Sequence, residues 1–270
     1  MEGENPRVVV IVPARLGSTR VPRKPLQRIG GREVVLRVCD AASRAARVDE
    51  VGVATDSEEI RRVVEKGGYR AWMTSPDHPT GTDRVAEAAR SVEADLVINV
   101  QGDEPFLPPG ALDLLVEEMN RETGRPLGTL VVPLEGEDEL HDPNVVKVVI
   151  DRSGGALYFS RAPVPWRFRE TEPARWKHVG VYAFRREALF RFVSLPRTEL
   201  EMSESLEQLR ALDHGMAIHV GRWPVAFHGV ETMEDLERAR RIVAGEAEAS
   251  AGDDGTVEAR DPTRGEESGS

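Results

Sequence analysis

The chain has 270 residues, of which 40% are hydrophobic, and this is enough for one large α/β domain with a core of its own. Its net charge of −11 argues against a nucleic acid as partner, although a local cluster of Arg and Lys can still bind a small anion. No apolar run approaches the roughly 20 residues that span a bilayer, and the acidic start is not typical of a signal peptide, so we expect a cytoplasmic protein without membrane insertion.

The first half of the chain alternates short apolar runs with amphipathic stretches. The runs predict buried strands at 8–12, 51–55, 71–74 and 96–100, and apolar spacing predicts helices at 33–46, 57–66, 83–92 and 110–120. The only cysteine, Cys39, is expected to be buried in the first helix, and a single cysteine excludes an intramolecular disulfide or a cysteine-based zinc site. Continuously apolar strands linked by helices predict a mainly parallel sheet with helices on both faces.

The second half is richer in strands, which are predicted at 127–133, 145–151, 155–160, 179–184 and 217–221. Two helices are predicted at 199–214 and 233–244. The first begins with the capping-box pattern of Thr198 and Glu201 and stops at Gly215. From Gly245 the chain loses periodicity and apolar content, so we expect residues 245–270 to form a disordered acidic tail.

The loop after the first strand carries the strongest functional signal. Ligands bind such sheets at the carboxyl ends of the strands, and here Arg15, Arg20, Arg23 and Lys24 lie within ten residues. Ser18 and the glycine before it let the backbone approach a ligand closely. Clustered cations on a proline-stiffened loop suit a triphosphate, although the P-loop and dinucleotide patterns are both missing. The alternative is a solvated basic loop, which two prolines around a lysine make less attractive.

Two further loops follow strands of the same predicted sheet. Asp103, in QGDEP after the strand at 96–100, is placed to ligate Mg²⁺, while an ordinary Gly-Asp turn is the alternative. In DHPTGTDR, Thr82 is predicted to cap the following helix, and the turn before it is suited to reading a nucleobase edge. Arg84 lies one turn into that helix, within reach of a phosphate or a base.

Segments along the whole chain then match one family. PARLGSTRVPRKPL, DHPTGTDR, INVQGDEP, ALYFSRAPVPW, KHVGVYAF and LEMSESLEQLRAL occur in this order. Together they resemble the 3-deoxy-manno-octulosonate cytidylyltransferases from about residue 8 to about residue 243. Sialic-acid and molybdopterin-type nucleotidyltransferases share the fold and the first loop, but not LYFSR or LEQLR.

The resemblance implies a magnesium-dependent nucleotidyltransferase that uses CTP and a small anionic acceptor. Its fold would be the Rossmann-like fold of nucleotide-diphospho-sugar transferases, with a smaller strand-rich region for acceptor binding and dimerisation. We expect one domain over residues 1–244, divided into a nucleotide-binding half at about 7–133 and an acceptor-binding half at about 134–244. A homodimer formed through the second half is also implied.

The resemblance also implies roles for individual residues. Lys24, Arg15 and Asp103 would be catalytic, with Lys24 nearest the departing pyrophosphate, and Asp103 and Glu231 would bind the metal. The residues implied to bind the nucleotide are Ala14, Arg15, Ser18, Arg20, Lys24, Thr80, Gly81, Thr82, Arg84 and Gln101. Those implied to bind the acceptor are Gln101, Arg161, His178, Tyr182, Glu207 and Gln208.

One position departs from the family pattern. The family has an aspartate in a GVD[ST] segment, whereas this chain has Gly229-Val230-Glu231-Thr232. The extra methylene moves the carboxylate by about 1.5 Å at full extension, which an octahedral Mg²⁺ would feel. The resemblance implies 3-deoxy-D-manno-octulosonate (Kdo) as the acceptor, and Glu231 is the feature that keeps another ulosonic acid or a phosphonate open as the alternative. A homologue that binds nucleotide without turning it over is a further alternative.

Overall fold

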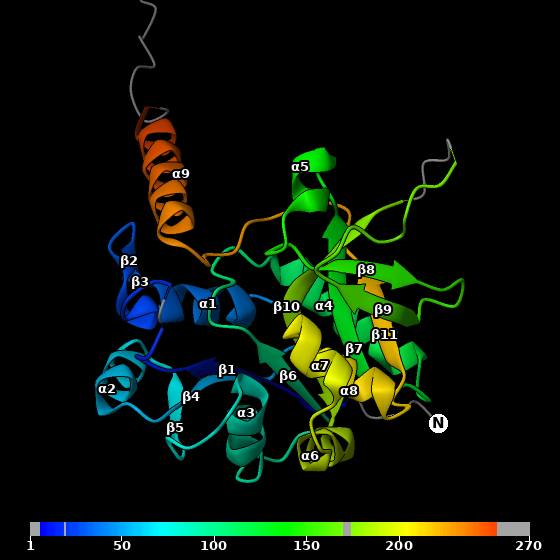
Figure 1. Cartoon of the computed structure of the whole chain (residues 1–270). Coiled ribbons are helices and arrows are strands. Elements are labelled where there is room, and N and C mark those ends of the chain that lie inside the picture. The colour runs from blue at the N-terminus through cyan, green and yellow to red at the C-terminus, as the bar shows by residue number, and fades with distance from the viewer. Residues whose placement is uncertain (1–5, 19, 170–173, 253–270) are drawn as a thin grey trace, which may run out of the picture.

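The structure is a computed structural model that describes residues 6–18, 20–169 and 174–252 (Figure 1). Its strands are β1 (Val8–Ala14), β2 (Arg28–Ile29), β3 (Arg32–Glu33), β4 (Glu50–Thr55), β5 (Arg70–Met73), β6 (Leu96–Val100), β7 (Leu127–Pro133), β8 (Lys147–Ile150), β9 (Ala156–Ser160), β10 (Trp176–Arg185) and β11 (Ile218–Arg222). Its helices are η1 (Lys24–Leu26), α1 (Val34–Ser43), α2 (Glu58–Lys66), α3 (Gly81–Ala89), α4 (Pro109–Arg121), α5 (Gly136–His141), α6 (Arg186–Ser194), α7 (Glu199–Glu204), α8 (Gln208–Asp213) and α9 (Met233–Gly252).

A nine-stranded sheet forms the centre of the molecule, and its main path runs β11-β7-β10-β6-β1-β4-β5. Strands β6, β1, β4 and β5 are parallel neighbours, and so are β11 and β7. Strand β10 runs antiparallel to β6 and β7, and β8 and β9 extend from it as an antiparallel pair. The predicted mainly parallel sheet is confirmed, with β10 reversed at its centre.

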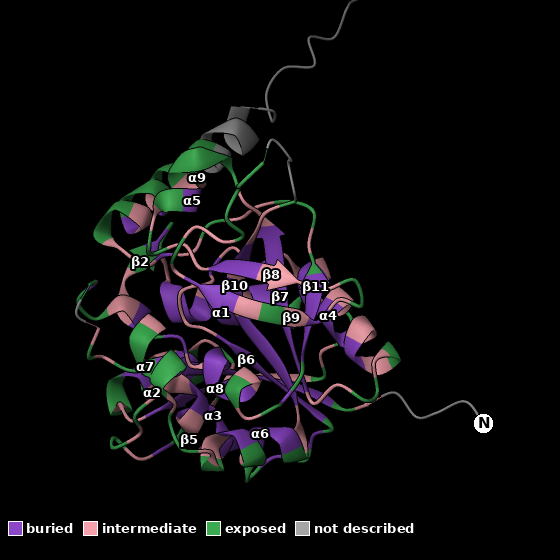
Figure 2. Ribbon diagram, turned by 45° about the vertical axis from the view of Figure 1, so that its right-hand side comes forward, coloured by how far each residue is buried: buried purple, intermediate pink, exposed green. Residues whose placement is uncertain are grey.

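The core lies on both faces of this sheet, and every residue of the central strand β1 is therefore buried. Successive side chains of a strand point to opposite faces. Val10 therefore packs in the cluster with α1, α2 and α4, whereas Ile11 packs in the cluster with α3, α6 and α8. Figure 2 shows the buried strands enclosed by helices whose outer sides are exposed. Cys39 is fully buried in the first cluster, as predicted.

The reversal of β10 brings the second half of the chain to the site edge of the sheet. Strands β1, β4 and β6 are parallel, so the loops that follow them share one edge. The antiparallel β10 begins near that edge, where Val181 is the register partner of Val100. The backbone N–H of Gln101 then donates to the carbonyl of Gly180 at 2.9 Å. Residues 178–182 therefore lie beside the loop that contains Asp103.

A third, smaller cluster ties the first loop to the C-terminal helix. Its fully buried members include Val21 in the first loop, Ile29 in β2 and Val230 beside Glu231. Helix α9 lies against β2, as Figure 1 shows, and its Arg240 donates to the carbonyl of Arg28 at 3.0 Å. The segments that carry Lys24 and Glu231 are therefore held together by a shared apolar core.

The predicted single helix at 199–214 is wrong, because the structure has two helices there. Ser205 ends α7 in the left-handed region with φ 53°, which interrupts the helical path before α8. Thr198 does cap α7 by accepting from the N–H of Glu201, as predicted, and the Glu201 carboxylate is buried. It forms a bidentate ion pair with Arg210 of α8, at 2.8 and 2.5 Å.

Other helices also differ from the prediction. Helices α5 and α6 were not expected, because α5 is short and acidic and α6 follows β10 without an intervening turn. Helix α9 continues to Gly252, beyond the predicted end at residue 244. The first part of the predicted disordered tail, residues 245–252, therefore belongs to this helix, and the rest of the predicted tail lies outside the described residues, as do residues 1–5 of the predicted domain.

Candidate functional site

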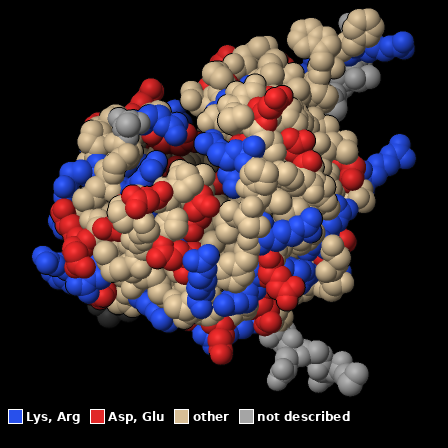
Figure 3. Space-filling view, turned by 60° about the horizontal axis from the view of Figure 1, so that its bottom comes forward, with Lys and Arg blue, Asp and Glu red and all other residues tan. Residues whose placement is uncertain are grey.

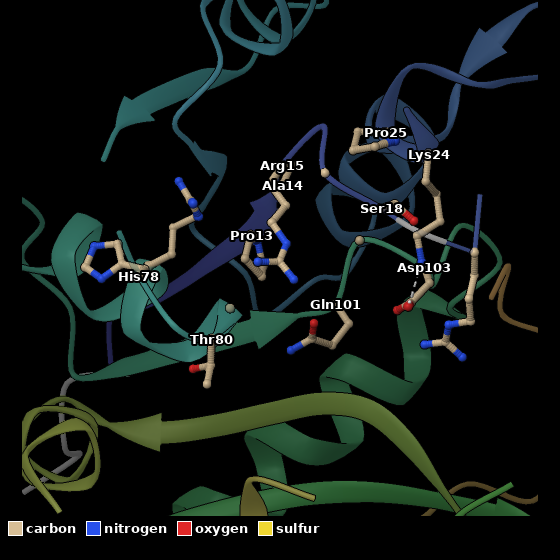
Figure 4. Close-up of a pocket in the computed structure, with 15 residues that line it drawn as sticks. Pro13, Ala14, Arg15, Ser18, Lys24, Pro25, His78, Thr80, Gln101 and Asp103 are labelled. Carbon is tan, nitrogen blue, oxygen red and sulfur yellow. Dashed lines mark hydrogen bonds and ion pairs between the residues drawn. The ribbon is translucent and has the colours of Figure 1, made fainter. Parts of the chain in front are cut away.

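A cavity of about 300 Å³ opens where the loops after β1 and β6 meet the beginning of α3 (Figure 4). Of the predicted nucleotide-binding residues, all except Thr82 line it. The lining consists of Pro13, Ala14, Arg15, Gly17, Ser18, Arg20, Lys24, Pro25, His78, Thr80, Gly81, Arg84, Gln101, Gly102 and Asp103. Residues far apart in the sequence are thus brought to one concave, cation-rich surface.

Lys24 is the most enclosed cation of the first loop. Arg23 takes a left-handed conformation with φ 53°, and the short helix η1 follows, anchored by the buried Pro25. This turn directs Lys24 at Asp103, with Nζ 3.0 Å from Oδ2 and side chains only 15% and 26% exposed (Figure 4). Arg23 itself points away and pairs with Glu59, and both side chains are about half exposed.

A second ion pair closes the same region from the C-terminal side. Arg20 Nη1 lies 2.6 Å from Glu231 Oε2. The backbone N–H of Val230 donates to the carbonyl of Asp103 at 2.7 Å, so the segments that carry the two predicted metal-binding carboxylates are joined directly. Each of these carboxylates therefore faces a cation of the first loop.

The turn before α3 differs from the prediction in its cap. Thr80, not Thr82, is the N-cap, because its hydroxyl accepts from the N–H of Asp83. Thr82 is completely buried and donates to the Glu207 carboxylate, so its side chain lies outside the lining of the nucleotide cavity. Prediction from local sequence chose the wrong threonine because both stand at a plausible capping position.

Arg84 lines the cavity but is already engaged by the protein. It is 3% exposed, donates from Nη1 to the Thr74 hydroxyl at 2.6 Å, and places Nη2 3.3 Å from Asp56 Oδ2. A guanidinium has five N–H donors in a rigid fork, so these contacts fix its plane and leave other donors available. The side chain is therefore oriented before any ligand binds.

A larger cavity of about 820 Å³ adjoins the first and has Arg20, Gly81, Gln101 and Asp103 in common with it. All predicted acceptor-binding residues line it, as does Glu231. These are Gln101 from the loop after β6, Arg161 after β9, His178 and Tyr182 from β10, and Glu207 and Gln208 at the start of α8. The shared wall makes a ligand in one cavity a neighbour of a ligand in the other.

His178 is held as a neutral hydrogen-bond acceptor. The Thr129 hydroxyl donates its one hydrogen to the carbonyl of Val181 at 2.7 Å, so the ring Nε2, 3.0 Å from the same oxygen, must carry the proton that it shares with Thr129. Nδ1 is then an acceptor. Burial lowers the pKa of His178 to about 3, which keeps the ring uncharged at neutral pH.

Glu207 and Gln208 each bring a buried polar atom without a partner among the described residues. These atoms are Oε2 of Glu207 and Nε2 of Gln208. Burial raises the pKa of Glu207, while the hydrogen bond from the Thr82 hydroxyl acts against that rise. An acceptor and a donor that lack partners beside the larger cavity suit a ligand that carries hydroxyl groups.

Arg161 and Lys147 hold the loop that forms one wall of this cavity. Arg161 donates to the carbonyls of Glu204 and Pro143, both at 2.7 Å. Lys147 is fully buried and donates to the carbonyls of Asp142, Val145 and Arg161, at 2.9, 2.7 and 2.6 Å. The guanidinium predicted to face the acceptor thus also fastens the chain around it.

Sequence reasoning missed Glu104, which lies among the predicted metal-binding groups. Its Oε1 accepts from the N–H of Gly180 at 3.1 Å. Burial and the charges of Asp103 and Glu231 raise the pKa of Glu104 to about 8. Burial and Asp103 also raise the pKa of Glu231. The only sequence signal was its place next to Asp103 in QGDEP. The ion pair of Lys177 with Glu139, also in the larger cavity, had no sequence signal.

The described residues form neither a membrane-spanning helix nor a metal site made of protein side chains alone. Within residues 6–18, 20–169 and 174–252, no helix is long and apolar enough to cross a membrane. Over the same part of the chain, no group of three or more His, Cys, Asp or Glu side chains is arranged to hold a metal ion by itself. Basic and acidic side chains are intermixed on the face drawn in Figure 3. The two adjoining cavities remain the best defined site.

Comparison with known proteins agrees with this geometry. A family model described as Cytidylyltransferase matches residues 9–218. The 3-deoxy-manno-octulosonate cytidylyltransferase of Anaeromyxobacter sp. is 49% identical over 241 residues, which cover 88% of this chain and 97% of the relative. The enzyme of the same name from Koribacter versatilis is 46% identical over 238 residues, covering 88% of this chain and 90% of the relative.

Solved structures give the same picture. A CMP:2-keto-3-deoxy-manno-octonic acid synthetase complexed with CTP has a TM-score of 0.85 and 40% identity, and the match covers 89% of this chain and 99% of the other. The 4-diphosphocytidyl-2C-methyl-D-erythritol synthase of Anaerococcus prevotii has a TM-score of 0.57 at 16% identity and covers 89% of this chain and 100% of the other, so it shares the fold alone.

Proposed function

This chain belongs to the cytidylyltransferase family, and we propose that it transfers CMP from CTP to the anomeric hydroxyl of Kdo, releasing pyrophosphate. The observation that carries the proposal is the wall shared by the two cavities, formed by Arg20, Gly81, Gln101 and Asp103. One cavity is rich in cations, and the other presents unpaired polar atoms, so a triphosphate and a hydroxylated acid would meet at this wall. The predicted cytoplasmic location is part of the same proposal.

The reaction would be a direct in-line displacement. The acceptor hydroxyl oxygen forms a bond to the α-phosphorus of CTP, the bond from that phosphorus to the bridging oxygen breaks, and pyrophosphate leaves while the hydroxyl proton passes to solvent. Lys24, Arg15 and Arg20 would neutralise the charge on the phosphates, and Arg84 would approach from α3. Such catalysis depends on positioning and electrostatic stabilisation, so no nucleophilic side chain is required.

Mg²⁺ would be held by Asp103 and Glu231, with Glu104 behind them. Burial raises the pKa values of Glu104 and Glu231 most, and the negative charges close to each carboxylate add to the rise; a cation would relieve this repulsion. Two carboxylates with phosphate oxygens from the nucleotide are a typical magnesium environment. When bound, the ion supplies Lewis-acid stabilisation of the phosphates and lowers the pKa of a coordinated hydroxyl. Lys24 and Arg20, which now face these carboxylates, would then be available to the phosphates.

Pyrophosphate release tests the function directly. With Mg²⁺ present, CTP and UTP are each offered with and without Kdo. We expect release to require both CTP and Kdo. Tight CTP binding without Kdo-dependent release would contradict the proposed acceptor, and equal release with UTP would contradict the proposed nucleotide.

Changing Glu231 tests the metal site. Glu231→Gln is expected to raise the Mg²⁺ concentration for half-maximal pyrophosphate release by about 10-fold or more, because the ion loses an anionic ligand. Glu231→Asp restores the family's residue and is expected to bind Mg²⁺ at least as well as the wild type. Isothermal titration calorimetry of Mg²⁺ binding to the protein, with a non-hydrolysable CTP analogue present, measures the metal affinity without turnover. The matched control is Glu237→Gln, an exposed carboxylate on α9. Equal metal affinity of Glu231→Gln and the wild type would refute this role.

A homodimer formed through the strand-rich half is part of the proposal. Leu157 of β9 is 60% exposed, and Trp166 and Phe168 in the following segment are 77% and 87% exposed. Large exposed apolar side chains of this kind mark interaction surfaces. We expect the double variant Trp166→Ser, Phe168→Ser to raise the dimer dissociation constant at least about 10-fold in sedimentation equilibrium. Met73→Ser, on β5 at the far edge of the sheet, is the control. A wild-type monomer at all concentrations would contradict the proposal.

A further inference from the structure

Thr82 belongs to the acceptor side of the site, although its sequence neighbours belong to the nucleotide side. Its side chain has no exposed surface and lies in the linings of neither cavity. The cap of α3 is supplied by Thr80, so the Thr82 hydroxyl is not needed there. Its partners are Glu207 at the start of α8 and Asn99 in β6. The hydroxyl therefore joins three elements beneath the wall between the cavities.

The hydrogen bonds around Thr82 run in one direction. Gln101 Nε2 lies 3.4 Å from Asn99 Oδ1, Asn99 Nδ2 donates to Thr82 Oγ1 at 3.0 Å, and Thr82 Oγ1 donates to Glu207 Oε1. Each group accepts from the one before and donates to the next, and a carboxylate that accepts ends the chain. If the Asn99 amide were reversed, the Thr82 hydroxyl would have to donate to it and Glu207 would lose its partner. An ionised carboxylate can only accept, so Glu207 fixes the direction, and the fully buried Asn99 supplies the matching donor.

This series of hydrogen bonds decides where the remaining carboxylate oxygen of Glu207 points. With Oε1 held by Thr82, Oε2 is the buried oxygen without a partner, and Glu207 lines the larger cavity. Leaving such an atom unpaired is costly, and a hydroxyl of the acceptor would satisfy it. We infer that Thr82 and Asn99 are positioning residues for the acceptor, acting through Glu207. This inference rests on the proposed function and assigns Thr82 a role different from the nucleotide contact expected from sequence.

The inference predicts which kinetic constant changes. Thr82→Val keeps the shape of the side chain and removes the donor. We expect kcat/KM for Kdo to fall about 10-fold or more, the size of a lost hydrogen bond to a charged group, while KM for CTP stays within about 2-fold. Thr82→Ser keeps the donor and is expected to restore most of the lost kcat/KM. Asn99→Asp replaces the donor to Thr82 with an acceptor, and it is expected to produce the same selective loss.

A matched control separates positioning from stability. Thr55 is also fully buried, and its hydroxyl accepts from the N–H of Ser57 at 3.1 Å, away from both cavity linings. Thr55→Val is expected to change Tm without changing the ratio of the two kinetic constants. If Thr82→Val raised KM for CTP instead, or if its kcat/KM for Kdo matched the wild type, the inference would be overturned.

A crystal structure of Thr82→Val gives a readout that does not depend on turnover. The Glu207 carboxylate is expected to rotate away from α3 toward the larger cavity. An unchanged carboxylate position would overturn the inference even if the variant were slow. If the wild-type protein showed no Kdo-dependent release of pyrophosphate, only the proposed function would be contradicted. The position of the Glu207 carboxylate in Thr82→Val would still decide the role of Thr82.

Discussion

Lys24→Met is expected to slow pyrophosphate release by about 1,000-fold at saturating CTP and acceptor. The side chain is 15% exposed and faces the nucleotide cavity, whose described lining contains no other lysine. As the α-phosphorus bond breaks, negative charge grows on the departing pyrophosphate. A preorganised cation in an enclosed site is worth far more there than in water, and loss of one such group costs roughly 10²–10³-fold or more in rate.

Arg23→Met is the matched control for Lys24→Met. Arg23 precedes Lys24 in the same loop, but its side chain is 54% exposed, pairs with Glu59 and lies outside both cavity linings. We expect its rate to remain within about 3-fold of the wild type, because exposed ion pairs contribute little. The measurement is single-turnover pyrophosphate release, which separates chemistry from product dissociation. A Lys24→Met rate within 10-fold of the wild type would show that Lys24 does not stabilise the leaving group.

Arg210→Met is expected to lower the free energy of unfolding by about 3–5 kcal/mol, because it leaves a buried carboxylate without its buried, bidentate partner. The side chains of Arg210 and Glu201 are 4% and 2% exposed, and they join α7 and α8 across the break at Ser205. Arg210 also lies over the Phe192 ring at 4.9 Å. Urea unfolding followed by circular dichroism measures the change.

The pH dependence gives this prediction a second test. Burial acts to raise the pKa of Glu201, but the pair with Arg210 outweighs it and holds the pKa below its ordinary value. A carboxyl with a lowered pKa stabilises the fold above its ordinary pKa of about 4.3, and this stabilisation is lost as the pH falls. The difference between the wild type and Arg210→Met is therefore expected to shrink below about pH 4.3.

Arg197→Met is the control for the buried pair. Arg197 shares the Glu201 carboxylate at 3.3 Å, but its own side chain is 55% exposed. We expect a loss of at most about 1 kcal/mol, as for other exposed pairs. A double variant with Glu201→Leu and Arg210→Met is expected to recover part of the stability, because no buried charge then remains unpaired. Equal losses for Arg197→Met and Arg210→Met would contradict the assigned role of burial.

Features that depend on neighbouring residues could be predicted from the sequence alone. Five successive apolar residues from Val8 predicted a strand buried on both faces, and β1 is buried throughout. The cations of the first loop stand next to one another in the chain, so their gathering at the end of β1 required only that this strand lie in a parallel sheet. The family resemblance added residues of the second half, such as His178 and Glu207, which local patterns would have left as ordinary surface or strand positions.

Only the tertiary structure decided how the two halves meet. Thr82 and Glu207 are 125 residues apart, and their contact depends on the reversed β10 and on the break at Ser205, neither of which has a local signature. The same holds for Glu104, whose pKa is raised by burial, by Asp103 beside it and by Glu231 from a distant segment. Strand and helix periodicity depends on residues a few positions apart, whereas these contacts depend on which elements pack together. The sequence therefore determined the parallel framework and the phosphate-binding loop, and the packing of distant elements decided which side chains share the site and in which protonation state.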